Sequence, residues 1–109
     1  MEKDLVSVLM VNYNHADTIE KAVKSVLNQT YPKVQLIIVD DGSTDDSVEI
    51  VKNIKDSRIE LYEENVNRQI CAVTNIGMQK VRGEYFARID SDDLWEENKL
   101  EIQLKYLKE

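Results

Sequence analysis

Two nearly continuous apolar runs constrain the fold of this chain most strongly. They lie at residues 5–11 and 34–39, and both consist almost entirely of aliphatic and β-branched residues. A run of this kind is typical of a strand buried on both faces of a parallel sheet. Between the two runs, apolar residues from position 18 to position 27 recur at helical spacing. The first part of the chain therefore predicts a strand–helix–strand unit.

The later part of the chain continues this alternation. The expected strands lie at residues 5–11, 34–39, 58–62 and 85–89, the third as a half-exposed edge strand, with helices between them and after the last. Asp17 and Glu20 have capping-box spacing before the first helix, Ser43 or Thr44 is expected to cap the second, and the third is expected to end near Gly83. We predict one α/β domain over residues 1–109, a Rossmann-like three-layer sandwich with a mostly parallel sheet.

Composition restricts the classes of partner and compartment. The 109 residues are 42% hydrophobic and 32% charged, as in a globular domain, and the net charge is −7. This acidity argues against nucleic-acid partners, which require a basic surface. No stretch approaches the roughly 20 apolar residues of a membrane span, and the lone Cys71 has no internal disulfide partner. We expect a cytoplasmic location. A longer protein that is held at the cytoplasmic face of a membrane would fit the same observations.

Acidic side chains follow two of the buried strands. In a parallel sheet ligands bind beyond the carboxyl ends of the strands, so residues 12–15, 40–43 and 90–93 should share one edge. Five carboxylates are expected there: Asp40, Asp41, Asp90, Asp92 and Asp93. Each acidic segment alone is equally well explained as a turn and helix cap. Together they favour a site for Mn²⁺ or Mg²⁺ with a phosphate ester or diphosphate, because such crowded carboxylates require a cation.

Other residues near this edge leave alternatives open. Tyr13 can stack on a nucleobase or be a partly buried loop aromatic. Arg68 and Arg88 are the nearest basic residues, and each can contact a diphosphate or form a structural ion pair. His15 can touch a ligand, but the favoured interpretation is a solvated loop residue. Trp95 can form a sugar-stacking platform, but the favoured interpretation is an anchor of the last helix in the core. The Gly-x-Gly-x-x-Gly and Gly-x-x-x-x-Gly-Lys motifs are absent, and one cysteine with one histidine leaves too few ligands for a zinc site.

Four segments in order carry a family resemblance. They are VSVLMVNYN at residues 6–14, SVLNQTY at 25–31, IVDDGSTD at 38–45 and GEYFARIDSDD at 83–93. Together they cover nearly the whole chain and resemble the N-terminal, nucleotide-sugar-binding half of family-2 glycosyltransferases with the GT-A fold. The resemblance implies that Val11 and Tyr13 hold a uracil, with Tyr13 stacked on it. It also implies that Asp41 accepts the uracil N3–H, with Asp40 beside it near the nucleoside.

The resemblance implies that the acidic segment at residues 90–93 binds a metal ion. Asp90 and Asp92 would be the Asp-x-Asp pair that spans ribose, diphosphate and Mn²⁺ or Mg²⁺, with Asp93 as an alternative or additional ligand. The chain departs from the family at Thr74, where many members have an arginine. Arg68 or Arg88 would then supply positive charge toward the diphosphate.

The implied function is the transfer of a sugar from a nucleotide diphosphate sugar to an acceptor hydroxyl on a glycan or a lipid-linked molecule, with inversion at the sugar. A UDP-sugar is the favoured donor. In the family an acceptor-binding half with the general base follows the Asp-x-Asp pair, so no catalytic residue is assigned in a chain that stops at Glu109. We expect a truncated domain that self-associates through the exposed edge of strand 85–89. The alternatives are a receiver-like, phospho-accepting signalling domain and a non-catalytic nucleotide-binding or interaction module.

Overall fold

Strands and helices alternate along the chain. The computed structural model describes residues 1–64 and 70–108, and in these the elements are β1 (Glu2–Asn12), α1 (Ile19–Leu27), β2 (Val34–Asp41), α2 (Ser47–Lys52), β3 (Ile59–Glu64), α3 (Ile70–Met78), β4 (Gly83–Asp90) and α4 (Lys99–Lys108). The four predicted strands and the helices between them are confirmed. Within these residues no helix combines the length and apolar content needed to cross a membrane.

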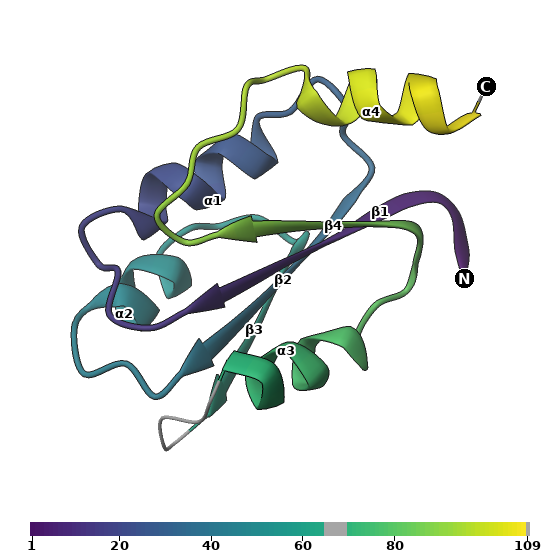
Figure 1. Ribbon diagram of the computed structural model, residues 1–109. Coiled ribbons are helices and arrows are strands. Elements are labelled where there is room, and N and C mark those ends of the chain that lie inside the picture. Colours follow the sequence, from purple (N-terminus) through teal and green to yellow (C-terminus); the bar gives the residue numbers. More distant parts are fainter. Residues whose placement is uncertain (65–69, 109) are drawn as a thin grey trace.

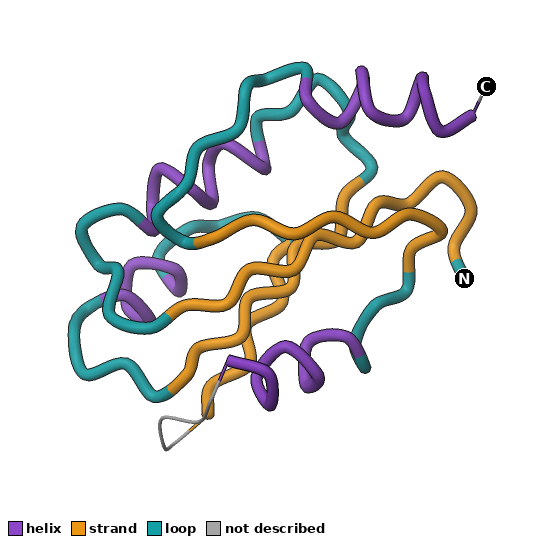
Figure 2. The backbone as a smooth tube through the Cα atoms, viewed as in Figure 1, coloured by secondary structure: helices purple, strands orange, loops and turns teal. Residues whose placement is uncertain are grey.

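The strands form one sheet with the order β3-β2-β1-β4, and every neighbouring pair is parallel. The loops that follow β1, β2 and β4 therefore gather at one end of the sheet (Figure 2). β3 and β4 are the edge strands, and β3 is mostly half-buried, as its alternating sequence predicts. The predicted α/β fold class is confirmed, with a wholly parallel sheet.

Helices cover both faces of the sheet. α1, α2 and α4 lie on one face and α3 lies on the other (Figure 1). Val8, Met10 and Ile38 point toward the first group of helices, whereas Leu9 and Ile37 pack with the α3 side. Because successive strand residues point to opposite faces, β1 and β2 must be apolar at nearly every position. This two-sided burial explains the continuous apolar runs.

The predicted capping box at the first helix is wrong. The N-cap of α1 is Thr18, not Asp17, and it makes no side-chain capping hydrogen bond. The Thr18 hydroxyl instead donates to the carbonyl of Ser91, at 3.0 Å. A tertiary contact has therefore replaced the local capping interaction that the sequence pattern predicts.

The predicted start of the second helix is also wrong. The N-cap of α2 is Asp46 rather than Ser43 or Thr44. The backbone N–H of Thr44 donates to Asn14 Oδ1, at 2.8 Å. Residue 44 is therefore bonded to the loop after β1, and the helix begins after it. The third helix ends at Met78, and Gly83 is the first residue of β4 rather than a helix terminus.

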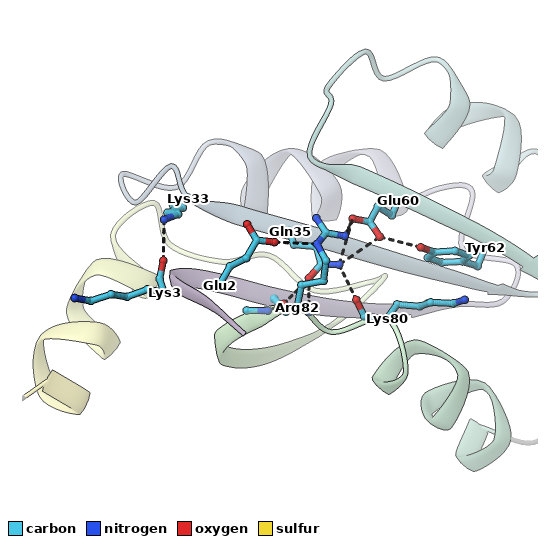
Figure 3. Close-up of polar contacts among 10 residues, drawn as sticks. Glu2, Lys3, Lys33, Gln35, Glu60, Tyr62, Lys80 and Arg82 are labelled. Carbon is cyan, nitrogen blue, oxygen red and sulfur yellow. Dashed lines mark hydrogen bonds and ion pairs between the residues drawn. The ribbon is translucent and has the colours of Figure 1, made fainter.

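A polar network ties the strands together at the opposite end from the acidic loops (Figure 3). Gln35 of β2 accepts from Ser7 Oγ of β1 at 2.5 Å and donates to the Glu60 carboxylate of β3 at 3.2 Å. Arg82, just before β4, donates to Glu60 at 2.5 Å. Burial raises the pKa of Glu60, but hydrogen bonds from Arg82, Tyr62 and Gln35 outweigh it and lower that pKa overall. The network fixes the relative positions of the strands that carry the site.

Candidate donor-binding site

A cavity of about 290 Å³ opens at the carboxyl ends of β2, β1 and β4. We call it the acidic pocket, and its lining residues are Val11, Tyr13, His15, Asp41, Asp90, Ser91 and Asp92. Each of them is either among the last residues of a strand or in the loop that follows β1 or β4. The pocket therefore occupies the position where ligands bind in parallel α/β sheets.

The sheet itself delivers three of these side chains. Val11 of β1 is paired with Asp90 of β4 and with Val39 of β2. Asp41 is the next β2 residue on the same face as Val39, because side chains alternate along a strand. Val11, Asp41 and Asp90 thus reach the pocket from three adjacent strands and from the face that α3 covers.

The loop after β1 contributes Tyr13 and His15. Asn14 between them has a φ of 55°, a left-handed conformation that asparagine tolerates better than most residues. Its backbone N–H donates to Ser43 Oγ at 2.9 Å, and its side chain accepts from Thr44. The loop after β1 is therefore fastened to the turn after β2, and Tyr13 is left 41% exposed at the pocket.

Asp40 points away from the pocket. Its Oδ1 accepts from Asn12 Nδ2 at 2.8 Å and from Ser43 Oγ at 2.7 Å, and its Oδ2 accepts from the Ser43 backbone N–H at 2.9 Å. Asp40 is only 3% exposed. Asp40 lies on the face of the sheet opposite to Asp41. The chain turns at Gly42, which follows Asp41 and has a φ of 75° that glycine adopts without strain. The Asp40 carboxylate organises the turn after β2.

Asp93 and Arg88 also lie outside the acidic pocket. Asp93 Oδ1 accepts from the backbone N–H of Leu94 at 2.9 Å, and Asp93 lines a separate groove with Trp95. Arg88 is on the same face of β4 as Asp90 and is exposed. It has no ion pair with any residue of the ranges 1–64 and 70–108. The prediction for Arg68 lies outside the described residues.

Three of the described residues that line the pocket carry carboxylates. Asp41, Asp90 and Asp92 line it, and His15 is the only described lining side chain that can carry a positive charge. In the described part of the chain, no three His, Cys, Asp or Glu residues are arranged to hold a metal ion by themselves. Asp90 and Asp92 fit a Mg²⁺ or Mn²⁺ site of the kind in which one or two carboxylates share the ion with phosphate oxygens.

The structure thus brings together five of the predicted site residues: Val11, Tyr13, Asp41, Asp90 and Asp92. The lining also includes His15, a loop residue that is partly exposed, and the buried Ser91. Their position in loops at the carboxyl edge is the only sequence signal for them. Trp95 packs against the core and Lys99 Nζ lies 5.4 Å from its ring centre, so its predicted role as a core anchor is confirmed.

The chain matches a known protein family and its members. The family model described as glycosyl transferase family 2 matches residues 7–109. An uncharacterized glycosyltransferase of Haemophilus influenzae is 41% identical over 109 residues, which cover 98% of this chain and 44% of that protein. The UDP-Glc:alpha-D-GlcNAc-diphosphoundecaprenol beta-1,3-glucosyltransferase WfaP of Escherichia coli is 39% identical over 95% of this chain and 41% of its own length.

A solved structure shares the fold. The mannosyltransferase PcManGT from Pyrobaculum calidifontis, in complex with GDP-Man and Mn²⁺, superposes with a TM-score of 0.87 and is 29% identical. The match covers 95% of this chain and 32% of that one. The chain therefore spans less than half the length of these relatives. By its sequence match and its fold, the chain belongs to glycosyl transferase family 2.

Proposed function

We propose that the acidic pocket is the donor site of a metal-dependent glycosyltransferase, and that its ligand is a UDP-sugar. The observation that carries this proposal is the convergence of Val11, Asp41 and Asp90 from three adjacent strand ends beside the exposed ring of Tyr13. An apolar floor, an aromatic ring and carboxylates are the groups that a nucleoside diphosphate bound to a metal requires.

The nucleoside would lie between Tyr13 and Asp41. A partly exposed tyrosine ring can stack on a nucleobase, and the Asp41 carboxylate can accept the N3–H of uracil. The cavity of about 290 Å³ is at the lower limit of small-molecule pockets, which have volumes of about 300–1,000 Å³. It therefore suits the nucleoside portion of a donor better than a whole nucleotide sugar.

Uracil is favoured over guanine by similarity. The relative named for UDP-Glc is 39% identical to this chain, and the mannosyltransferase bound to GDP-Man is 29% identical. We therefore assign UDP, and treat GDP as the competing ligand in the test below.

Asp90 and Asp92 would hold Mn²⁺ or Mg²⁺ together with the diphosphate oxygens. The ion, when bound, neutralises charge on the nucleoside diphosphate as it leaves the sugar. Asp93 ranks below these two residues as a ligand, because its carboxylate accepts from Leu94 and lies outside the pocket. Arg88 would reach the diphosphate only by extending past Asp90 on the same face of β4.

The transfer itself is proposed for a protein longer than these 109 residues. This chain matches only 44% and 41% of the two sequence relatives. We propose that a further part binds the glycan or lipid-linked acceptor and supplies the general base, and that the sugar transfers with inversion. We also propose that the 109-residue chain alone pairs with a second copy through β4, which is an edge strand of the described sheet.

Isothermal titration calorimetry of the 109-residue chain tests the donor site. We expect saturable binding of UDP, and the affinity should be about tenfold higher with Mn²⁺ than without it. UDP should also bind more tightly than GDP. Asp41→Asn should weaken UDP binding with and without the metal, and the double variant Asp90→Asn/Asp92→Asn should abolish only the effect of the metal. Glu49→Gln on the exposed side of α2 removes the same charge as one of these changes, and is the matched control.

Two outcomes would contradict the proposal. Absence of saturable UDP binding, with or without Mn²⁺, would remove the donor site from this chain. Unchanged metal-dependent binding in the double variant at positions 90 and 92 would show that the acidic residues have only a structural role, as in a non-catalytic interaction module.

A further inference from the structure

The loop between β4 and α4 carries Asp92 into the acidic pocket. This loop, residues 91–98, follows α1 from its amino end to its carboxyl end before α4 begins (Figure 1). Both ends of α1 hold it through hydrogen bonds. The position of Asp92 therefore depends on a helix that contributes no side chain to the pocket lining.

At the amino end of α1, the contact is made by Thr18. Threonine at an N-cap usually accepts a hydrogen bond from its own helix, but Thr18 makes no such bond. Its Oγ1 donates instead to the carbonyl of Ser91, at 3.0 Å. Ser91 is 2% exposed and lies between Asp90 and Asp92 in the sequence. The hydroxyl thus fixes the backbone at the point from which Asp92 projects.

At the carboxyl end of α1, the contact is made by Gln29. Its Nε2 donates to the carbonyls of Ser25, at 3.0 Å, and Glu96, at 2.6 Å. Its Oε1 accepts from the backbone N–H of Leu100, at 2.9 Å, which is one of the N–H groups that the first turn of α4 leaves without a helical partner. Gln29 is buried, and its side-chain amide joins α1, through Ser25, to the far end of the loop, through Glu96 and Leu100.

The helix between these two contacts is rigidly packed. Ile19, Ala22, Val23 and Val26 are fully buried against the sheet. The backbone N–H of Thr30, just beyond the helix, also donates to the carbonyl of Glu97, at 2.7 Å. A loop fixed at both ends to one packed helix samples far fewer conformations than a free loop of the same length.

We propose that Thr18 and Gln29 are positioning residues for Asp92, an inference that rests on the proposed donor site. By holding residues 91 and 96–100 against α1, they direct the Asp92 carboxylate into the pocket, where it shares the metal ion with the diphosphate. Sites of this kind depend on side chains that lock the residues touching the ligand. Loss of either contact should weaken the metal-dependent part of nucleotide binding and leave the metal-independent part intact.

Paired substitutions at Thr18 separate this role from simple destabilisation. Thr18→Val removes the hydroxyl at nearly constant volume, and Thr18→Ser retains it. We expect Thr18→Val to reduce the gain in UDP affinity on adding Mn²⁺ by about fivefold, the effect of losing one hydrogen bond. Thr18→Ser, which keeps the hydroxyl, should show the full gain in affinity on adding Mn²⁺. Val51→Ala, a core change in α2 away from the loop, is the control for lost stability.

Amide hydrogen exchange without ligand tests the contacts independently of UDP binding. In Gln29→Met the Leu100 N–H loses its acceptor, so exchange at Leu100 and across residues 92–97 should accelerate about tenfold relative to the amides of β1. Unchanged exchange in Gln29→Met, or an unchanged Mn²⁺ effect in Thr18→Val, would overturn the positioning role. Absence of UDP binding by the unaltered chain would instead contradict the proposed donor site.

Discussion

Asp40 and Asp41 are neighbours in the sequence but face opposite sides of the sheet. Both belong to β2, which continues to Asp41, so strand alternation separates their side chains. Asp41 reaches the acidic pocket, whereas Asp40 accepts hydrogen bonds from Asn12 and Ser43. A strand that ended at Val39, as predicted, would leave both carboxylates in the turn beyond it and at one site.

The structural role of Asp40 predicts a large effect on stability. Asp40→Ala leaves the amide of Asn12 and two donors of Ser43 without their acceptor, so we expect the free energy of unfolding to fall by about 3 kcal/mol. Urea denaturation followed by circular dichroism measures this change. Asp46→Ala is the matched control, because Asp46 is exposed and makes no side-chain capping bond, and it should change stability by less than about 0.5 kcal/mol. Equal effects of the two changes would contradict the assignment.

Glu60 predicts how stability depends on acid. Burial raises its pKa, but the stronger combined effect of hydrogen bonds from Arg82, Tyr62 and Gln35 lowers it below its ordinary value of 4.5. The ionised carboxylate therefore stabilises the folded state above that value, and the contribution is lost as the pH falls through the lowered pKa. Between about pH 5 and pH 3, the decline in stability should be shallower in Glu60→Gln than in the unaltered chain. Parallel curves from urea titrations would contradict this.

At the scale of elements, the sequence predicted the strands better than the helix ends. β1 and β2 are buried on both faces, so nearly every residue of their central parts must be apolar. The sequence therefore shows these strands directly. The helix starts depend on single hydrogen bonds. Thr18 bonds to Ser91 and Thr44 bonds to Asn14, and both partners are distant in the sequence. Local capping patterns carry no information about such partners.

Gly83 tests the close approach of β4 to β1. A Cβ atom at this position would lie 2.5 Å from the Leu5 carbonyl oxygen and 2.8 Å from Ser7 Oγ. Because the nearest atom belongs to the backbone, Gly83→Ala should lower the free energy of unfolding by about 3 kcal/mol. The control is Arg88→Ala in the same strand, where an exposed side chain should change stability by less than about 0.5 kcal/mol. Thermal or urea unfolding measures both, and a neutral Gly83→Ala would contradict the packing.

At the scale of the whole molecule, the sequence predicted where the site lies but not which residues share it. The parallel sheet placed the acidic segments at one edge, and Asp41, Asp90 and Asp92 do line one pocket. Asp40 lies outside the pocket because β2 continues to Asp41, whereas the exclusion of Asp93 and the inclusion of His15 and Ser91 depend on loop conformations. Those conformations are set by contacts between loops, such as that of Asn14 with Ser43.

The edge of β4 predicts association of the isolated chain. α3 covers β1 and β2, while Phe86 on the same face of β4 is 46% exposed, and among the described strands β4 pairs with β1 alone. An unpaired strand edge next to exposed apolar surface favours pairing with another chain. Sedimentation velocity should show a dimer that increases with concentration. Phe86→Lys should reduce it, and a strictly monomeric chain at every concentration would contradict the prediction.

The location of the nucleotide is the most direct test of the donor site. We propose to titrate the ¹⁵N-labelled chain with UDP and Mg²⁺ and to follow the backbone amide resonances. Saturable shifts are expected at Tyr13, Asp41, Ser91 and Asp92, in the acidic pocket. The groove lined by Trp95, Asn98 and Gln103 should remain unchanged. Shifts confined to that groove, or no saturable shift at all, would contradict the assignment of the acidic pocket to the nucleotide.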